Sequence, residues 1–260
     1  MLNYTVYKHS DDAEWVTFIH GAGGSSSIWY KQIRDFSKQF NVLLVDLRGH
    51  GKSKKPFQEK LKKYSFQRIG DDVVEVLNHL KISSTHFVGI SLGTIIIRDI
   101  TERFQHLTKS MILGGAVMKL NLRGQILMRV GATFKSVIPY LILYRFFAFV
   151  IMPKKSHRES RNLFINEAKK LYQKEFKRWF TLIAQINPLL SFFRIKDAGV
   201  PTLYIMGAED HMFLPSISKL VSNHASSQLH VIPNCGHVVN VQQPELFNEK
   251  VIKFINELKN

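Results

Sequence analysis

The chain has 260 residues, of which 45% are hydrophobic, and this composition suits one α/β domain with a sizeable core rather than a mostly disordered chain. Its formal net charge is +16, a large excess of Lys and Arg. Cys235 is the single cysteine, which excludes an intramolecular disulfide and a thiolate metal cluster. The histidines lack a metal-binding spacing such as His-Glu-x-x-His, and we expect neither a metal nor a cofactor.

Two features of the sequence bear on where the protein is found. Residues 1–15 lack the basic segment, apolar run and small-residue cleavage site of a secretory signal. The most apolar stretch, residues 137–152, is interrupted by Arg145 and is shorter than the roughly 20 residues that cross a bilayer. We therefore predict a cytoplasmic protein without a transmembrane helix.

Along the chain, short apolar runs bounded by Gly, Asp or Ser alternate with stretches of helical period, which is typical of a mainly parallel sheet covered by helices. We predict strands at residues 15–19, 42–45, 86–90, 110–113, 202–206 and 229–232. Helices are predicted at residues 28–38, 66–80, 92–104, 215–223 and 244–258.

A glycine-rich turn, His-Gly-Ala-Gly-Gly at residues 20–24, follows the first of these strands. Such a turn leaves backbone N–H groups free and lets a substrate approach closely. In a hydrolase the N–H of Ala22 would supply half of an oxyanion hole, and the N–H of Leu92 would supply the other half. A phosphate-binding loop is the alternative, but the Lys-Ser/Thr ending of nucleotide loops is missing.

Ser91 lies in the string Gly89-Ile90-Ser91-Leu92-Gly93, between a predicted strand and a predicted helix. A nucleophile on so tight a turn needs small flanking residues, and it lies at a helix N-terminus that favours developing negative charge. The alternative is that Ser91 only caps the helix. The context of the string favours a nucleophile.

The alternation of strands and helices breaks between about residues 118 and 196, which read as helices throughout. We therefore predict a core formed by residues 1–117 and 199–260 and a helical cap, or lid, formed by residues 118–198. An apolar stripe at helical spacing indicates one amphipathic helix there, for which core packing is a commoner explanation than a ligand-binding wall. The stripe consists of Phe176, Trp179, Phe180, Ile183 and Ile186.

The positive charge is concentrated in the same segment. Residues 119–198 contain sixteen Lys or Arg against four Asp or Glu, whereas the rest of the chain has twenty basic and sixteen acidic residues. This asymmetry suggests that the cap meets an anionic partner, either an anionic membrane surface or an anionic substrate. A solvated face of a Lys-rich protein is an equally good explanation.

Two polar residues follow late strands and complete a candidate triad. Asp210 comes directly after the strand at residues 202–206, although Glu209 and His211 are close competitors. His237 follows the last strand and precedes a plausible helix start at Pro244. The order Ser, Asp, His differs from the orders of other triad proteases.

The whole chain resembles the α/β-hydrolase family on the glycine motifs at residues 20–24 and 89–93 and on three more. Residues 46–53, Asp-Leu-Arg-Gly-His-Gly-Lys-Ser, are similar to the family's D-x-R-G-x-G-x-S loop. Residues 207–215 are similar to its Gly-x-x-Asp acid loop, and residues 236–245 to its Gly-His ending before Pro-Glu. The resemblance implies an α/β fold with a mostly parallel central sheet flanked by helices and an inserted helical cap.

The expected activity is that of a carboxylesterase-like serine hydrolase. Ser91 would attack an ester, thioester or lactone carbonyl, with His237 as general base and Asp210 orienting it. We expect a small acyl substrate, apolar or anionic. Ile90, where many relatives have a polar or aromatic residue, would lie at the floor of the substrate pocket, and aromatic cap residues would line it. These are Phe134, Tyr140, Tyr144 and Phe147.

Alternative functions remain open at this point. Similar proteins cleave C–C bonds or catalyse eliminations in quinone biosynthesis with the same triad, and others use it as a slow ligand sensor in signalling. No nucleic-acid-binding motif accompanies the positive charge, so we do not expect a nucleic-acid partner. The oligomeric state is not indicated by the sequence.

Overall fold

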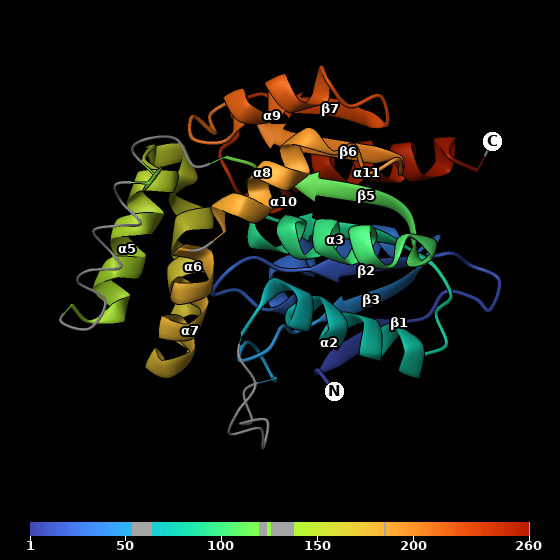
Figure 1. Ribbon diagram of the computed structural model, residues 1–260, viewed down its shortest axis with the longest axis horizontal. Coiled ribbons are helices and arrows are strands. Elements are labelled where there is room, and N and C mark those ends of the chain that lie inside the picture. Colours follow the sequence, from blue (N-terminus) through green and yellow to red (C-terminus); the bar gives the residue numbers. More distant parts are fainter. Residues whose placement is uncertain (54–63, 120–123, 126–137, 185, 260) are drawn as a thin grey trace.

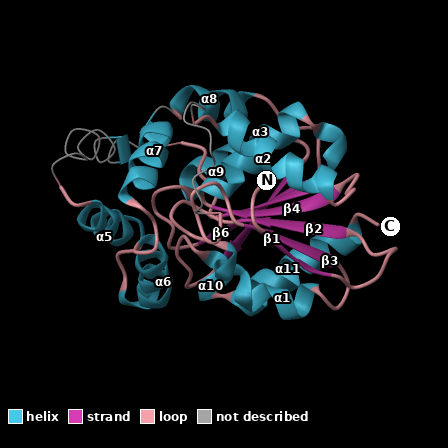
Figure 2. Cartoon of the chain, turned by 90° about the horizontal axis from the view of Figure 1, so that it is seen from below, coloured by secondary structure: helices cyan, strands magenta, loops and turns pink. Residues whose placement is uncertain are grey.

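The computed structural model describes residues 1–53, 64–119, 124–125, 138–184 and 186–259. In these residues seven strands form one sheet, with helices on both of its faces (Figures 1 and 2). Further helices lie beyond the edge at which the parallel strands end (Figure 1). This is the α/β fold with added helices that the sequence predicts.

The strand order is β1-β3-β2-β4-β5-β6-β7, and every neighbouring pair is parallel except β1 with β3. All six predicted strands are confirmed. Their bounds are Trp15–Ile19 for β2, Asn41–Val45 for β3, Thr85–Ile90 for β4, Thr108–Gly114 for β5, Thr202–Gly207 for β6 and Ser227–Ile232 for β7.

Strand β1, Tyr4–Tyr7, was not predicted. Its residues alternate between half-buried and exposed, whereas every residue of β3, β4 and β6 is buried. A four-residue edge strand has no continuous apolar run, and its pairing with β3 depends on residues far away in the chain, such as Val45 opposite Tyr4. Short-range patterns therefore could not identify it.

The predicted core helices are confirmed with small shifts at their ends. They are α1 (Tyr30–Phe36, preceded by the 3₁₀ turn Ser26–Trp29), α2 (Phe66–His79), α3 (Leu92–Arg103), α9 (Leu214–Val221) and α11 (Pro244–Glu257). The sequence signals at two starts are visible: the Ser65 hydroxyl accepts from the Arg68 N–H, and Pro244 opens α11. Two short helical turns, Gln105–Leu107 and α10 (Val239–Gln242), complete the core.

The hydrophobic core forms one layer on each face of the sheet. On one face α2 and α3 bury side chains such as Val73 and Ile96, and on the other α1 and α11 bury Phe36 and Phe247. Because the central strands are covered on both faces, they read as continuous apolar runs. This burial explains why the strands were recognisable from sequence.

Between β5 and β6 the described chain is helical, as predicted for the cap. The helices are α5 (Tyr140–Ile151), α6 (Arg158–Ala168, after the 3₁₀ turn Lys155–His157), α7 (Gln173–Ala184) and α8 (Asn187–Ile195). Figure 1 shows α5, α6 and α7 beyond the carboxyl ends of the parallel strands. The limits proposed for the cap, residues 118 and 198, stay a prediction.

No helix among the described residues is both long enough and apolar enough to cross a membrane.

Polar contacts hold the cap helices over the core. The indole N–H of Trp179 donates to the carbonyl oxygen of Arg48 at 3.1 Å, and the Tyr64 hydroxyl donates to the Glu175 carboxylate. At the other end of the cap, Glu159 pairs with Lys31 at 2.8 Å. The cap helices therefore have a fixed position relative to the sheet.

The loop after β3 is stabilised by a buried ion pair that gives the first testable prediction. Arg48 Nε and Nη2 donate to Asp72 Oδ2 and Oδ1 at 2.8 and 2.7 Å, and both side chains are buried. Asp72→Ala would remove a carboxylate that accepts two hydrogen bonds from a buried guanidinium, so we expect the free energy of unfolding to fall by about 3–5 kcal/mol in urea titrations. Lys38→Ala, which breaks an exposed pair with Asp35, is the control and should change it by less than about 0.5 kcal/mol. Equal losses of unfolding free energy in the two variants would show that the buried ion pair contributes no more to stability than the exposed one.

Candidate active site

Ser91 lies at the sharp turn between β4 and α3, as the sequence predicted. Its φ of 53° and ψ of −119° place a non-glycine residue in a strained region of backbone space. The turn is held by the neighbouring strand, because the Ser91 N–H donates to the Gly114 carbonyl at 2.9 Å. This backbone geometry holds the side chain at the carboxyl edge of the sheet, where it lines a cavity.

The two glycines that flank Ser91 lie close to neighbouring parts of the chain. A Cβ atom at Gly93 would lie 2.3 Å from the carbonyl oxygen of Ile19 in β2, and one at Gly89 would lie 2.5 Å from the Ile97 side chain. Because real Cβ atoms do not approach backbone oxygen so closely, helix α3 can start here only with glycine at position 93. The second glycine of the Gly-x-Ser-x-Gly string is thus a steric requirement of this turn, whereas the first lies in a tightly packed position.

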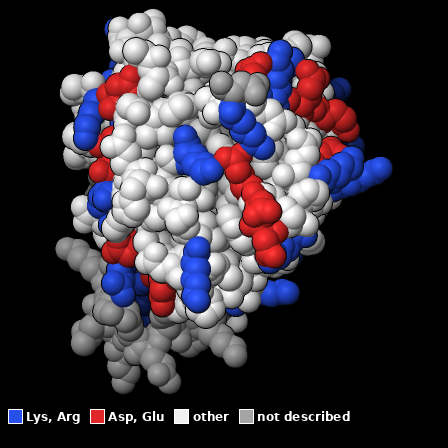
Figure 3. Space-filling model, turned by 90° about the vertical axis from the view of Figure 1, so that its right-hand side faces the viewer, with Lys and Arg blue, Asp and Glu red and all other residues white. Residues whose placement is uncertain are grey.

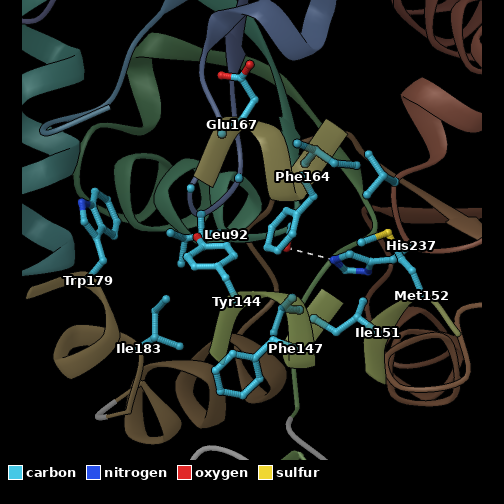
Figure 4. Close-up of a pocket in the computed structure, with 18 of the residues that line it drawn as sticks. Leu92, Tyr144, Phe147, Ile151, Met152, Phe164, Glu167, Trp179, Ile183 and His237 are labelled. Atoms are coloured by element: carbon cyan, nitrogen blue, oxygen red, sulfur yellow. Dashed lines mark hydrogen bonds between the residues drawn. The ribbon is translucent and has the colours of Figure 1, made fainter. Parts of the chain in front are cut away.

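The structure brings Ser91, His237 and Asp210 together in one chain of hydrogen bonds. His237 Nε2 lies 2.9 Å from Ser91 Oγ, and His237 Nδ1 lies 2.7 Å from Asp210 Oδ2. Figure 4 shows His237 at the side of the cavity with its hydrogen bond directed inward. With the Asp210 carboxylate ionised, Nδ1 carries the proton and donates to it, so Nε2 accepts from the Ser91 hydroxyl.

Of the three competing residues Glu209, Asp210 and His211, Asp210 is the one that hydrogen-bonds to His237. Its carboxylate is 1% exposed and also accepts from the Phe213 N–H at 3.2 Å. Glu209 instead turns toward the cap, where Lys154 and His157 donate to its carboxylate at 2.8 and 2.7 Å. These two hydrogen bonds hold the pKa of Glu209 below its usual value.

The predicted oxyanion-hole residues line the same cavity as Ser91. Leu92 is the first residue of α3, so its N–H has no intrahelical partner, and Ala22 lies on the glycine-rich turn opposite. At Gly21 a Cβ would lie 3.2 Å from both the Ile90 carbonyl oxygen and the Ser91 Cβ, so the turn packs directly on the nucleophile.

Two buried histidines, whose roles the sequence did not reveal, hold this turn in place. His50 Nε2 accepts from the Gly23 N–H at 3.0 Å, and His20 Nε2 accepts from the Leu47 N–H at the same distance. His20 Nδ1 also donates to the Gly21 carbonyl at 2.7 Å. Burial lowers the pKa of His20, so its ring stays neutral and keeps Nε2 as an acceptor. The only sequence signal was their place in the two glycine motifs.

The cavity beside Ser91 has a volume of about 180 Å³ and an almost entirely apolar wall. Figure 4 shows aromatic and aliphatic side chains of the cap helices around it. The cap contributes Tyr144, Phe147 and Ile151 from α5, Leu163 and Phe164 from α6, and Phe176, Trp179, Phe180 and Ile183 from α7. Burial raises the pKa of the Tyr144 hydroxyl, which therefore stays neutral. Glu167 brings a carboxylate to the rim of the wall, where it accepts from Ser25 Oγ at 2.8 Å and pairs with Lys170.

The predicted pocket residues have mixed outcomes. Ile90, Tyr144 and Phe147 line the cavity. Tyr140 is not among the residues that line it: its hydroxyl donates to the Leu171 carbonyl at 2.8 Å and its ring packs on Phe176. Phe134 lies outside the described residues.

The apolar stripe on α7 is packed into buried hydrophobic clusters, as the favoured explanation predicted, and it also faces the cavity. Phe176, Trp179, Phe180 and Ile183 all line it, as does Ile186 at the start of α8. Ile151 was missed, but its spacing from Tyr144 and Phe147 was a usable signal, since the three positions share one helix face. Leu163 and Phe164 gave no such signal.

The geometry limits the chemistry of the site. Within the described ranges no group of His, Cys, Asp or Glu side chains is arranged to hold a metal ion. The cavity also contains a serine hydroxyl hydrogen-bonded to a histidine, beside the glycine-rich turn and under the helices of the cap. This arrangement is suited to nucleophilic attack on a carbonyl carbon.

The family model of the alpha/beta hydrolase fold matches residues 14–244, and the chain belongs to this family. It is an enzyme of the alpha/beta-hydrolase fold, as predicted. A putative carbamate hydrolase of Acinetobacter baylyi is 25% identical over 98% of each chain. A 3-oxoadipate enol-lactonase of the same organism is also 25% identical, over 96% of this chain and 91% of the relative.

A solved structure shows the same fold. A thermophilic esterase from Thermogutta terrifontis superimposes with a TM-score of 0.81 at 18% identity, covering all of this chain and 94% of the other. At this level of identity the likeness concerns the fold alone. The particular substrate of this enzyme must therefore be argued from its own residues.

Cys235, two residues before His237, provides a test of the packing around the site. Its thiol is fully buried, and burial raises its pKa to about 12. Because only the thiolate is alkylated efficiently, we expect iodoacetamide to leave the native protein unmodified near pH 8 and to react once urea unfolds it. Mass spectrometry of both samples measures this. Rapid modification of the native protein would mean that the histidine loop opens readily.

Proposed function

We propose that this enzyme hydrolyses carboxylic esters with an apolar acyl group through a covalent acyl-enzyme on Ser91. The observation that carries the proposal is the hydrogen-bond chain from Ser91 Oγ through His237 to Asp210, at 2.9 and 2.7 Å, next to an apolar cavity. Thioesters and lactones would react by the same steps.

In the first half of the reaction, Ser91 Oγ attacks the carbonyl carbon while His237 Nε2 takes the hydroxyl proton. The negative charge that develops on the carbonyl oxygen is stabilised by the N–H groups of Ala22 and Leu92. The C–O bond to the leaving group then breaks, and His237 gives its proton to the departing alkoxide oxygen. Asp210 stabilises the imidazolium that exists between the two transfers.

In the second half, water takes the place of the alcohol. His237 Nε2 removes a proton from the water as it attacks the acyl-enzyme, and the same oxyanion site receives the charge. Collapse releases the carboxylic acid and returns the proton to Ser91 Oγ. The sequence of steps needs no group beyond the side chains and backbone of this chain.

The lining of the cavity supports an apolar acyl group. Its wall consists mainly of Phe, Ile, Leu, Tyr and Trp side chains, and the carboxylate of Glu167 is paired with Lys170. The relatives are named for carbamate and enol-lactone substrates, in which a heteroatom is likewise bonded to a carbonyl carbon. Attack on such a carbon is the chemistry they have in common with an esterase.

A fluorophosphonate probe tests whether Ser91 is an activated nucleophile. We expect one equivalent of covalent label on the wild-type protein and none on Ser91→Ala, read by intact-mass spectrometry. An unlabelled wild-type protein of native fold would contradict the proposal. Labelling together with very slow turnover of every ester would instead favour a ligand sensor.

Asp210 and Glu209 are adjacent carboxylates that allow a matched comparison. Asp210→Asn should lower kcat on a soluble ester by about 10⁴, because the histidine loses its orienting charge and tautomer. Glu209→Gln removes a carboxylate that contacts the cap and should change kcat less than about tenfold. Similar losses in the two variants would remove Asp210 from its assigned role.

The size of the acyl pocket can be measured with p-nitrophenyl esters of increasing length. Each buried CH₂ contributes about 0.8 kcal/mol, so kcat/KM should rise about fourfold per added carbon until the cavity is filled. Ile183→Trp should lower the acyl chain length at which kcat/KM stops rising, because Ile183 lines the cavity. Ala184→Trp, on the exposed side of the same helix, serves as the control and should leave this chain length unchanged. A flat series would argue against an apolar acyl pocket.

A further inference from the structure

Helix α5 is apolar on its inner and its outer side. Its twelve residues, Tyr140–Ile151, contain one charged side chain, Arg145. The inner side contributes Tyr144, Phe147 and Ile151 to the wall of the cavity. The outer side exposes Ile142, Phe146 and Phe149, which are 56%, 52% and 52% accessible.

A helix that is apolar all round is normally buried in protein or lipid, and a surface helix normally has a polar outer side. Positions 142, 146 and 149 are three and four residues apart, so their side chains form one continuous apolar strip. At 1.5 Å per residue a helix of this length measures about 18 Å, which is too short to cross a hydrocarbon core of about 30 Å. The strip therefore suits the surface of a bilayer, with the helix lying in its plane.

Unneutralised positive charges accompany the strip. Arg145 lies on the same helix face, and Lys155 and Arg158 follow in the turn that leads into α6. All three side chains are exposed, and within the described part of the chain none has an ion-pair partner. Long basic side chains can extend toward phosphate groups while their methylene groups stay near the apolar region.

The carboxylates of the cap do not offset this charge. Glu159 pairs with Lys31 of the core, Glu167 is buried beside Lys170, and Glu175 pairs with Arg178. The fourth, Asp197, accepts from the backbone N–H groups of Gly199 and Ser226. The side of the molecule opposite the cap has a different character, because Lys and Arg are interspersed there with Asp and Glu (Figure 3). The charge distribution therefore distinguishes the cap from the rest of the surface.

We propose that the outer side of α5, formed by Ile142, Phe146 and Phe149 with Arg145, Lys155 and Arg158 beside it, docks on an anionic lipid bilayer. The apolar strip enters the interface and the cations contact the phosphate groups. A second copy of the chain suits this surface poorly, since two like-charged caps would repel each other.

Docking in this orientation has a consequence for the enzyme. In this orientation helix α5 lies between the bilayer and the apolar cavity. Its exposed outer side faces the bilayer, and its inner side lines the cavity. An acyl substrate held in the membrane would thus be brought next to the cavity wall. The docking itself needs no catalysis, so it stands or falls separately from the proposed hydrolase activity.

The experiment is co-sedimentation of the full chain with vesicles of phosphatidylcholine alone and of phosphatidylcholine with phosphatidylglycerol. We expect binding to the anionic vesicles at about 0.1 M salt and much weaker binding at about 1 M, where the Debye length falls from about 10 to about 3 Å. Ser91→Ala should bind as well as the wild type, which separates docking from catalysis.

Variants assign the binding to this surface. Phe146→Glu should lower the partition coefficient at least tenfold, whereas Phe192→Glu, at an exposed position of α8, should leave it within about twofold. Lys155→Ala and Arg158→Ala should each lower it about fivefold. Unchanged turnover of a soluble short ester by Phe146→Glu would show that the variant is folded.

Three results would overturn the proposal. The first is absence of binding to anionic vesicles by a folded wild-type protein. The second is binding that Phe146→Glu and Phe192→Glu weaken equally. The third is a dimer in light scattering that Phe146→Glu alone converts to monomer, which would assign the strip to a second copy of the chain.

Discussion

At the start of α3 the helix backbone lies directly against the end of β2, and this close approach constrains the rest of the site. Position 93 has no room for a Cβ atom, because it would lie 2.3 Å from the Ile19 carbonyl oxygen. The same approach holds Ser91 at a positive φ and sets the Leu92 N–H opposite the turn that carries Ala22. Ser91 and the two residues expected to donate to an oxyanion are thus positioned by backbone packing, which does not depend on a bound substrate.

The remaining polar groups reach Ser91 because parallel strands end at one edge of the sheet. Asp210 follows β6 and His237 follows β7, two strands that are direct neighbours. The loops after these two strands pack closely against each other, which restricts their conformations. A Cβ at Gly207 would lie 2.2 Å from the carbonyl oxygens of Cys235 and Gly236. Residues separated by as many as 146 positions in the chain can therefore hydrogen-bond at 2.9 Å.

The cap is the part of the structure that forms most of the cavity wall around this arrangement. Its helices α5 and α7 turn apolar faces toward the cavity, while the outer side of α5 is also apolar and exposed. A stripe such as Phe176 to Ile183 has the same period whether it packs a core or encloses a ligand. The sequence could therefore identify the helix but not what its apolar face contacts.

The sequence by itself determined the elements and the candidate triad, because buried parallel strands are continuous apolar runs and because Ser91 lies two positions before a glycine that the turn requires sterically. Only the tertiary structure decided between Asp210 and Glu209, which are adjacent in the chain but turn to different partners. It also excluded Tyr140 from the cavity and revealed β1 and the supporting histidines His20 and His50. These features depend on contacts between distant segments, which no local pattern of residues encodes.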